Sequence, residues 1–96
     1  SFGPVAYINS FETEEEAVTR ANNTRYGLAA YAFTEDMSRA FRMTEELEAG
    51  MITINDGVPT TTQCPFGGVK QSGWNRELGI EGMDAFMEQK HVCIKV

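Results

Sequence analysis

The fold of this chain is decided by residues 28–55, LAAYAFTEDMSRAFRMTEELEAGMITIN, in which a helix pattern separates two apolar runs. Leu28–Phe33 and Met51–Asn55 are short and mostly apolar, which is typical of buried strands. Asp36 can cap the intervening helix, and Gly50 is placed to end it. The apolar positions of this helix are Met37, Ala40, Phe41 and Leu47. Strands joined through a helix are expected to be parallel, with a right-handed crossover.

Upstream of this unit the sequence predicts one more strand and one more helix. Val5–Phe11 is rich in β-forming residues and follows a Gly-Pro pair, so we expect a strand there. Thr13 and Glu16 have the spacing of a capping box, in which a hydroxyl and a carboxylate satisfy backbone donors of the first helical turn. We expect this helix to stop at Asn22 and Asn23, and Tyr26-Gly27 is interpreted as a further stop signal.

Downstream, residues 56–76 are rich in glycine and proline and show no period, which predicts a long loop of the kind that is usually functional. A short helix is expected over Ile80–Gln89, and Met83, Phe86 and Met87 would share one of its faces. His91–Val96 alternates apolar with other residues, which predicts a closing strand. The order β-α-β-α-β, long loop, short helix and strand indicates an α/β fold.

The predicted sheet has too little cover to be complete. A chain of 96 residues makes one domain at most, and three short helices can barely cover both faces of a parallel sheet. We therefore expect other segments of a longer polypeptide, or another subunit, to complete the sheet. The chain also starts at Ser1 without an initiating Met, which leads us to expect a fragment.

Charge and cysteine content exclude several classes of function. Fourteen acidic and eight basic residues give a formal net charge of −6, which opposes binding to a phosphate backbone, so no nucleic acid partner is expected. No apolar run approaches the roughly 18–20 residues of a membrane helix, so we expect a soluble, cytoplasmic protein with no membrane contact. Cys64 and Cys93 lie far apart beside a single histidine, which indicates neither a disulfide framework nor a zinc site.

No side chain carries a clear signature of catalysis. Cys64 precedes Pro65 and has no neighbouring histidine to lower the pKa of its thiol, so a structural role is favoured. Cys93 is interpreted as a small apolar residue of the last strand, and His91 as an ordinary residue at the start of that strand. Local features therefore assign no catalytic residue and no metal ligand.

The segment from Pro65 to Gly73 is the exception, because adjacent glycines permit close approaches and Lys70 and Ser72 add hydrogen-bond donors. It can be interpreted as a loop that binds a substrate or an anion. An elaborate turn that needs glycine for its backbone conformation is the alternative. A Walker-type loop is excluded, because the G-x-x-x-x-G-K-[ST] spacing is absent.

This glycine-rich segment, from Phe66 through Gly73 to Arg76-Glu77, resembles the P-F-G-G-x-K-x-S-G-x-G-R-E block of the NAD(P)-dependent aldehyde dehydrogenase superfamily. The resemblance covers essentially all of residues 2–96. Other stretches similar to family motifs, in the same order, are Phe2-Gly3-Pro4-Val5, Glu15-Glu16-Ala17 through Ala21-Asn22, Tyr26 to Ala30, and Gly50 to Asn55. The run Thr60-Thr61-Thr62 before Cys64-Pro65 is similar to succinate-semialdehyde dehydrogenases in particular.

The resemblance implies a two-step oxidation of an aldehyde, in which a cysteine thiolate attacks, a hydride passes to NAD or NADP, and a glutamate-activated water hydrolyses the thioester. It implies that Phe2 lies against the nicotinamide end of the cofactor and that Phe66 lines the aldehyde pocket as an aromatic wall. The loop from Asp56 to Cys64 would help to set substrate choice. Within it, the hydroxyls of Thr60 and Thr61 would bind the far carboxylate of the substrate.

Some parts of the family pattern are missing from this chain. The nucleophilic cysteine, the general-base glutamate and the dinucleotide-binding half lie upstream in the family, so we expect the chain to be inactive alone. Residues 1–90 would then be the C-terminal part of a catalytic domain, and residues 91–96 the oligomerisation strand of a dimer or tetramer. Asn75 stands where the block usually has its second glycine, beside the bulky Trp74. The alternative function is a small stand-alone α/β module that binds a ligand or dimerises.

Overall fold

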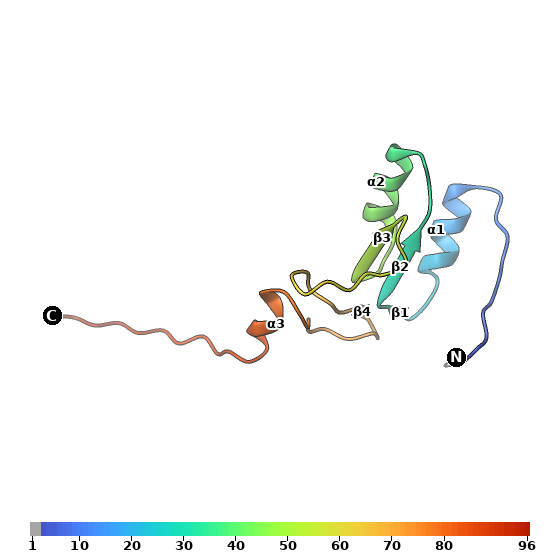
Figure 1. The fold of residues 1–96 in the computed structure, drawn as a ribbon. Coiled ribbons are helices and arrows are strands. Elements are labelled where there is room, and N and C mark those ends of the chain that lie inside the picture. Colours follow the sequence, from blue (N-terminus) through green and yellow to red (C-terminus); the bar gives the residue numbers. More distant parts are fainter. Residues whose placement is uncertain (1–2) are drawn as a thin grey trace.

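A computed structural model describes residues 3–96 and shows a mixed α/β chain (Figure 1). Phe2, the residue expected at the cofactor, lies outside the described residues. The elements in chain order are α1 (Glu14–Asn22), β1 (Tyr26–Gly27), β2 (Ala29–Ala32), α2 (Met37–Glu46), β3 (Met51–Ile54), β4 (Val69–Lys70) and α3 (Glu81–Asp84).

The β2-α2-β3 unit forms as predicted. β2 and β3 are parallel neighbours, in register from Ala29 opposite Met51 to Ala32 opposite Ile54. Helix α2 connects them and presents Met43 to the sheet. Met43 and Met51, each 8% exposed, are the only buried apolar side chains in the part of the chain that the structure describes. The core is therefore very small.

Both long helices begin at the predicted caps. The Thr13 hydroxyl accepts a hydrogen bond of 3.1 Å from the Glu16 amide, and the Glu16 carboxylate accepts one of 2.9 Å from the amide of Glu12. Asp36 likewise accepts a bond of 3.1 Å from the Arg39 amide at the start of α2. These bonds satisfy backbone donors that have no partner inside a helix.

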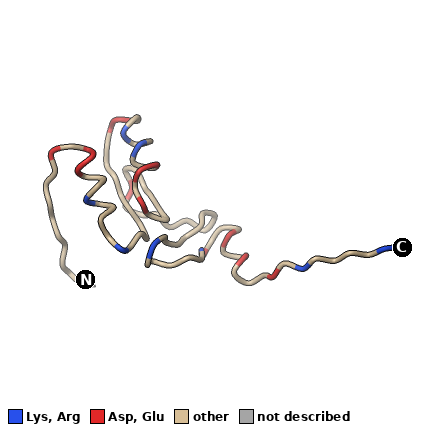
Figure 2. Tube along the Cα trace, turned by 180° about the vertical axis from the view of Figure 1, so that it is seen from behind, with Lys and Arg blue, Asp and Glu red and all other residues tan. Residues whose placement is uncertain are grey.

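Ion pairs fasten α1 to α2. Glu14 of α1 accepts hydrogen bonds from Arg42 and Arg39 of α2, and these bonds lower the pKa of the Glu14 carboxyl from its ordinary value of 4.5 to about 2. Figure 2 shows acidic positions at the start of α1 and toward both ends of α2, with basic positions between them on α2. Because residues 14 and 42 are far apart in the sequence, this contact holds the two helices side by side.

A second small sheet was not predicted. Tyr26 and Gly27, interpreted from the sequence as stop signals, form β1 and pair antiparallel with Lys70 and Val69 of β4. The loop predicted over residues 56–76 is therefore interrupted by a strand. This pairing brings the glycine-rich segment back onto the start of β2.

Gly50 does not end α2, which was its predicted role. The helix stops at Glu46 and Leu47 is its C-cap, three residues earlier. Gly50 instead donates its amide to the carbonyl of Gly27 at 3.0 Å and lies against the backbone of Gly67. The residue is thus required for a close approach between two segments rather than for a helix end.

The structure does not confirm the elements predicted at the two ends of the chain. Residues 5–11 pair with no strand in the described part of the chain, and α3 covers only four of the ten residues expected to be helical. Residues 91–96 form no strand within residues 3–96 and run away from the rest of the molecule as an extended tail (Figure 1). Strands and short helices need a packed partner, and these segments have none here.

The molecule exposes far more surface than a compact protein of its mass. Its radius of gyration is 17.8 Å, whereas about 12 Å is typical of a compact domain of this length. Its accessible surface is 8403 Å², and a compact chain of this mass exposes about 5,500 Å². Among residues 3–96 no helix has the length and apolar composition needed to cross a membrane.

Candidate functional site

The glycine-rich segment folds back on itself, with Phe66 near one end and Glu77 at the other. The amide of Phe66 donates to the carbonyl of Glu77, and the amide of Glu77 donates to the carbonyl of Phe66, each at 2.7 Å. This reciprocal antiparallel pair closes residues 66–77 into a loop with a defined base. Phe66 is therefore held at a fixed place in the backbone.

Arg76 holds the interior of this loop. Its guanidinium donates to the carbonyls of Gly68 at 2.7 Å, Asn75 at 3.1 Å and Trp74 at 3.5 Å. All three bonds come from the same nitrogen, Nη1, which draws the three carbonyl oxygens together around one charged group. The sequence identified Arg76 only as part of a motif and did not predict that it would hold the loop carbonyls together.

Gly67 allows Arg76 to come this near. A Cβ atom at Gly67 would lie 2.5 Å from the Asn75 carbonyl oxygen and 2.8 Å from the Arg76 Cδ. Asn75, which replaces the second glycine of the family block, is not among the residues with positive φ. The replacement therefore imposes no left-handed strain, and Gly73, with φ of 120°, makes the turn instead.

A hollow of about 470 Å³ lies beside Phe66 and is lined mainly by the loop itself. Trp74 belongs to its lining and is 93% exposed. The lining residues are Leu28, Phe66, Gly67, Gly68, Ser72, Gly73, Trp74, Asn75, Arg76 and Glu77. An aromatic side chain in a concave loop is a suitable wall for a small organic ligand.

Lys70 is not free to bind a substrate or an anion, as one interpretation of the sequence expected. Its ammonium donates to the carbonyl of Asn22 at 2.9 Å and to that of Thr24 at 3.4 Å, and it pairs with the carboxylate of Glu48. The carbonyls at the C-terminal end of α1 carry negative partial charge, which favours a cation there. Lys70 thus anchors the loop to the end of α1.

Ser72 has a second anchoring contact, because its hydroxyl oxygen accepts a hydrogen bond of 2.9 Å from the amide of Gly27. Gly68 packs against the Ser72 side chain from within the loop. Of the two interpretations of the glycine-rich segment, the structural turn describes Lys70 and Ser72, because their side chains are bonded to the end of α1 and to β1. The substrate interpretation remains open for Phe66 and the hollow beside it.

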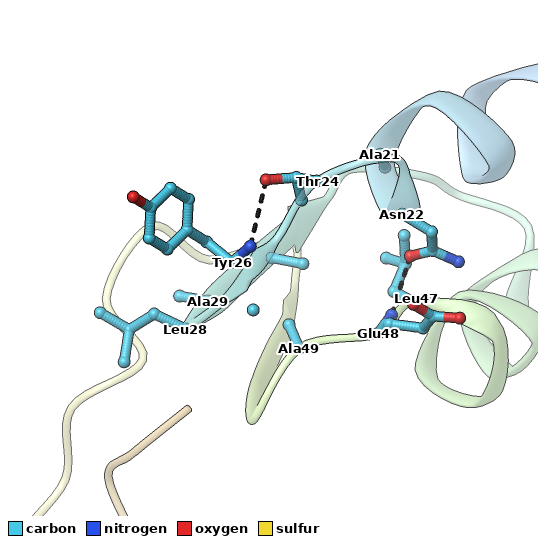
Figure 3. A pocket seen from close by; sticks show the side chains of 11 residues that line it. Ala21, Asn22, Thr24, Tyr26, Leu28, Ala29, Leu47, Glu48 and Ala49 are labelled. Carbon is cyan, nitrogen blue, oxygen red and sulfur yellow. Dashed lines mark hydrogen bonds between the residues drawn. The ribbon is translucent and has the colours of Figure 1, made fainter. Parts of the chain in front are cut away.

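Figure 3 shows the region behind this anchor, a hollow of about 250 Å³ between the end of α1, β1 and residues 47–49. The Asn22 side chain lies at one side of it, close to Leu47 and Glu48, and its Oδ1 accepts a bond of 2.9 Å from the Glu48 amide. The Nδ2 of Asn22 donates to the carbonyl of Glu46 at 2.8 Å. Asn22 therefore joins the ends of both helices at the place where Lys70 fastens the loop.

Thr60 and Thr61 lie on the exposed segment that follows β3, and neither lines the hollow beside Phe66. The backbone of their segment is joined to the base of the loop, because the Gly79 amide donates to the Thr62 carbonyl at 3.1 Å. Cys64 and Cys93 are free and exposed. His91 is exposed as well. The structure therefore gives none of these three side chains a buried environment.

Comparison with known proteins gives a consistent result. The model of the aldehyde dehydrogenase family matches residues 1–92. Over 93 residues, 97% of this chain, the sequence is 50% identical to the mitochondrial succinate-semialdehyde dehydrogenase of Oryza sativa subsp. japonica and 46% identical to that of Homo sapiens. The chain spans only 18% and 17% of the length of these two relatives.

A solved structure shows the same backbone. The betaine aldehyde dehydrogenase of Staphylococcus aureus, in complex with NAD+, superimposes with a TM-score of 0.92 and 46% sequence identity. The similarity covers 95% of this chain and 18% of the solved chain. Because nearly all of the chain is covered, the open shape of residues 3–96 is also the shape of one part of a larger solved protein.

Proposed function

The chain belongs to the aldehyde dehydrogenase family, and we propose that residues 1–90 form the C-terminal part of the catalytic domain of an enzyme that oxidises an aldehyde with NAD or NADP. The observation that carries this proposal is the closed loop of residues 66–77, which presents Phe66 to a hollow of about 470 Å³. In this role Phe66 is one wall of the aldehyde pocket, and Arg76 keeps that wall in place through the loop carbonyls.

The exposed surface supports packing against the rest of a longer polypeptide. Compared with a compact protein, the chain exposes an excess of about 2,900 Å², which exceeds the area that stable protein interfaces usually bury. Large apolar side chains account for part of it, including Ile8, Phe33 and Phe86. The alternative of a stand-alone module is disfavoured, because such a module would leave these side chains in water.

The chemistry of this chain is limited to building the pocket. The cofactor, when bound, would accept the hydride, and in this proposal the nucleophilic cysteine and the general-base glutamate come from the rest of a full-length enzyme. The sequence has no G-x-G-x-x-G turn for a pyrophosphate, and Lys70 is engaged with backbone carbonyls and Glu48. The residues described here thus offer no phosphate cradle, and Phe2 is the single contact with the cofactor that we propose.

We further propose that the substrate is a semialdehyde with a carboxylate at its far end, such as succinate semialdehyde. The support comes from Thr60 and Thr61, whose hydroxyls are exposed and donate to no other side chain in the described region. A hydroxyl that donates to a carboxylate makes a charge-assisted bond, which is stronger than a neutral one. Betaine aldehyde, the substrate in the name of the S. aureus enzyme, carries the opposite charge and would gain nothing from these hydroxyls.

The experiment compares aldehydes in the full-length enzyme that contains this chain. We expect a higher kcat/KM for succinate semialdehyde than for betaine aldehyde or for butanal, which lacks the carboxylate. Thr60→Val or Thr61→Val should raise the KM for succinate semialdehyde roughly tenfold and leave that for butanal unchanged, since only a bond to a charged group is lost. Thr19→Val, on the exposed surface of α1, is the matched control. Equal kcat/KM values for the three aldehydes would contradict the substrate proposal.

The remaining proposals concern assembly and location. Residues 91–96 pair with a strand of another subunit in a homodimer or homotetramer, which would supply the partner that this tail lacks here. A cytoplasmic location stays a prediction, and the rice and human relatives are named as mitochondrial proteins. NAD and NADP are both retained as candidate cofactors.

A further inference from the structure

Asn55 ends β3 in a backbone conformation that most residues avoid. Its φ is 60°, in the left-handed region, where asparagine is tolerated far better than branched or bulky residues. The ladder of β2 and β3 reaches this point unbroken, because the Asn55 amide donates to the Ala32 carbonyl at 2.8 Å. The positive φ then turns the chain out of the sheet and into the loop that carries Thr60 and Thr61.

The Asn55 side chain continues the sheet after its backbone has left it. Its Oδ1 accepts a hydrogen bond from the Thr34 amide, and its Nδ2 donates to the Thr34 carbonyl, each at 2.8 Å. One carboxamide therefore pairs with both polar groups of a residue just beyond β2, as a backbone residue of a strand would. Asparagine is the smallest residue whose side chain donates from one atom and accepts at another, as this pairing requires.

The residues on either side of Asn55 hold the same turn. Val58 donates its amide to the Asp56 carboxylate at 2.9 Å, and the Thr53 hydroxyl donates to the Asp56 carbonyl at 3.1 Å. The direction in which the loop leaves the sheet is thus set by bonds on both sides of a single left-handed residue. Further along, the Thr62 carbonyl is bound to Gly79 near the base of the Phe66 loop.

We infer that Asn55 is a positioning residue for substrate recognition, because it sets the direction in which the loop that carries Thr60 and Thr61 leaves the sheet. This inference rests on the proposed function. Asn55 touches no reacting atom in this scheme and acts through the loop alone. Its loss should therefore weaken binding of the aldehyde and leave the chemical step and the cofactor unaffected.

The test uses three variants of the full-length enzyme. Asn55→Gly keeps access to the left-handed conformation and removes both side-chain bonds. Asn55→Asp keeps an acceptor for the Thr34 amide and loses the donor to the Thr34 carbonyl. Asn9→Gly is the matched control, since Asn9 is exposed and distant in sequence from the loop.

Two measurements are made on each variant. In hydrogen exchange, Asn55→Gly should speed exchange at Thr34 and over residues 56–64 roughly tenfold, with Met51–Ile54 unchanged, since the sheet itself is intact. In kinetics, the KM for succinate semialdehyde should rise roughly tenfold at constant kcat, with unchanged affinity for the cofactor. Asn55→Asp should lie between Asn55→Gly and the unmodified enzyme, and Asn9→Gly should match the unmodified enzyme.

The possible failures are distinguishable. Exchange over residues 56–64 that is the same in Asn55→Gly and the unmodified enzyme would overturn the inference. Faster exchange at an unchanged KM would overturn it too, because Asn55 would then hold the loop without any effect on the substrate. If the unmodified enzyme oxidises no aldehyde, the proposed function fails. The exchange comparison then still decides whether Asn55 holds the loop.

Discussion

Gly50 lies against the loop of residues 66–77, which carries Phe66. This contact leads to a prediction for Gly50→Ala, which adds a single methyl group. A Cβ atom at position 50 would overlap the Gly67 carbonyl oxygen and lie 2.8 Å from the Gly68 Cα, whereas ordinary contacts begin near 3.4 Å. Gly50 does not have a positive φ, so the overlap is the only penalty for alanine at this position. The contact with Gly68 alone calls for a movement of about 0.6 Å, and the closer overlap with the Gly67 oxygen calls for more, so the loop would have to move away by more than about 0.6 Å.

The expected magnitude follows from this displacement. Overpacking of this kind costs about 1–3 kcal/mol of unfolding free energy. Because the loop carries Phe66, kcat/KM for the aldehyde should also fall roughly tenfold, in keeping with the steep dependence of catalysis on position. Both quantities should be measured for Gly50→Ala in the full-length enzyme, by chemical denaturation and by steady-state kinetics.

Gly57→Ala is the control for stability. No heavy atom lies within 4 Å of a Cβ at position 57, and its φ is not positive, so the added methyl meets open space. Its unfolding free energy should stay within about 0.5 kcal/mol of the unmodified enzyme. If Gly50→Ala is as stable as Gly57→Ala and keeps full activity, the close packing of Gly50 on the loop is refuted.

Three further predictions concern the pocket, the helix pair and the tail. Phe66→Ala in the full-length enzyme should lower kcat/KM for the aldehyde more than cofactor affinity, measured by steady-state kinetics and by titration with NAD; the reverse pattern would place Phe66 at the cofactor instead. Because the pKa of Glu14 is depressed in the folded state, its ion pairs stabilise the protein fully above about pH 4.5 and are lost as the pH falls toward 2. The difference in stability between Glu14→Gln and the unmodified protein, followed by denaturation at several pH values, should therefore shrink over that range, and a constant difference would argue against the ion pairs. Deletion of residues 91–96 should reduce the oligomer mass or weaken association in light scattering, and unchanged values would refute an intersubunit strand.

The parts of the fold that the sequence predicted depend on local signals. The caps at Thr13 and Asp36 act within four residues of themselves, and both formed as expected. The apolar runs around α2 are long enough to pair with each other inside this chain, so β2 and β3 formed as well. In these cases a segment of the chain contains everything that its structure needs.

The predicted elements that did not form need packing partners that residues 3–96 do not supply. Residues 5–11 have the composition of a strand, but Tyr7 and Ile8 remain exposed beside no other strand of the described chain. α3 stops after four residues, and Phe86, which was expected on the apolar face of a longer helix, is 91% exposed. Short helices gain most of their stability from tertiary packing, which is lacking at this end of the molecule.

The candidate site was predictable as a segment but not as a set of contacts. The run of glycines marked the loop, and the resemblance singled out Phe66. The bonds of Lys70 reach Asn22, 48 residues away, and those of Asn55 reach Thr34, 21 residues away. No spacing rule connects residues so distant, although an asparagine directly after a buried strand is a signal that can be sought in other sequences.

The most direct test of the central claim is cofactor reduction by two proteins, the full-length enzyme and the chain of residues 1–96 alone. Each is supplied with succinate semialdehyde and either NAD or NADP, and formation of the reduced cofactor is followed over time. We expect the full-length enzyme to reduce one of the two cofactors and the isolated chain to reduce neither, because the proposed function assigns the nucleophile and the dinucleotide-binding half to the remainder of the enzyme. Reduction by the isolated chain at a comparable rate, or a full-length enzyme inert toward every aldehyde tested, would contradict the account.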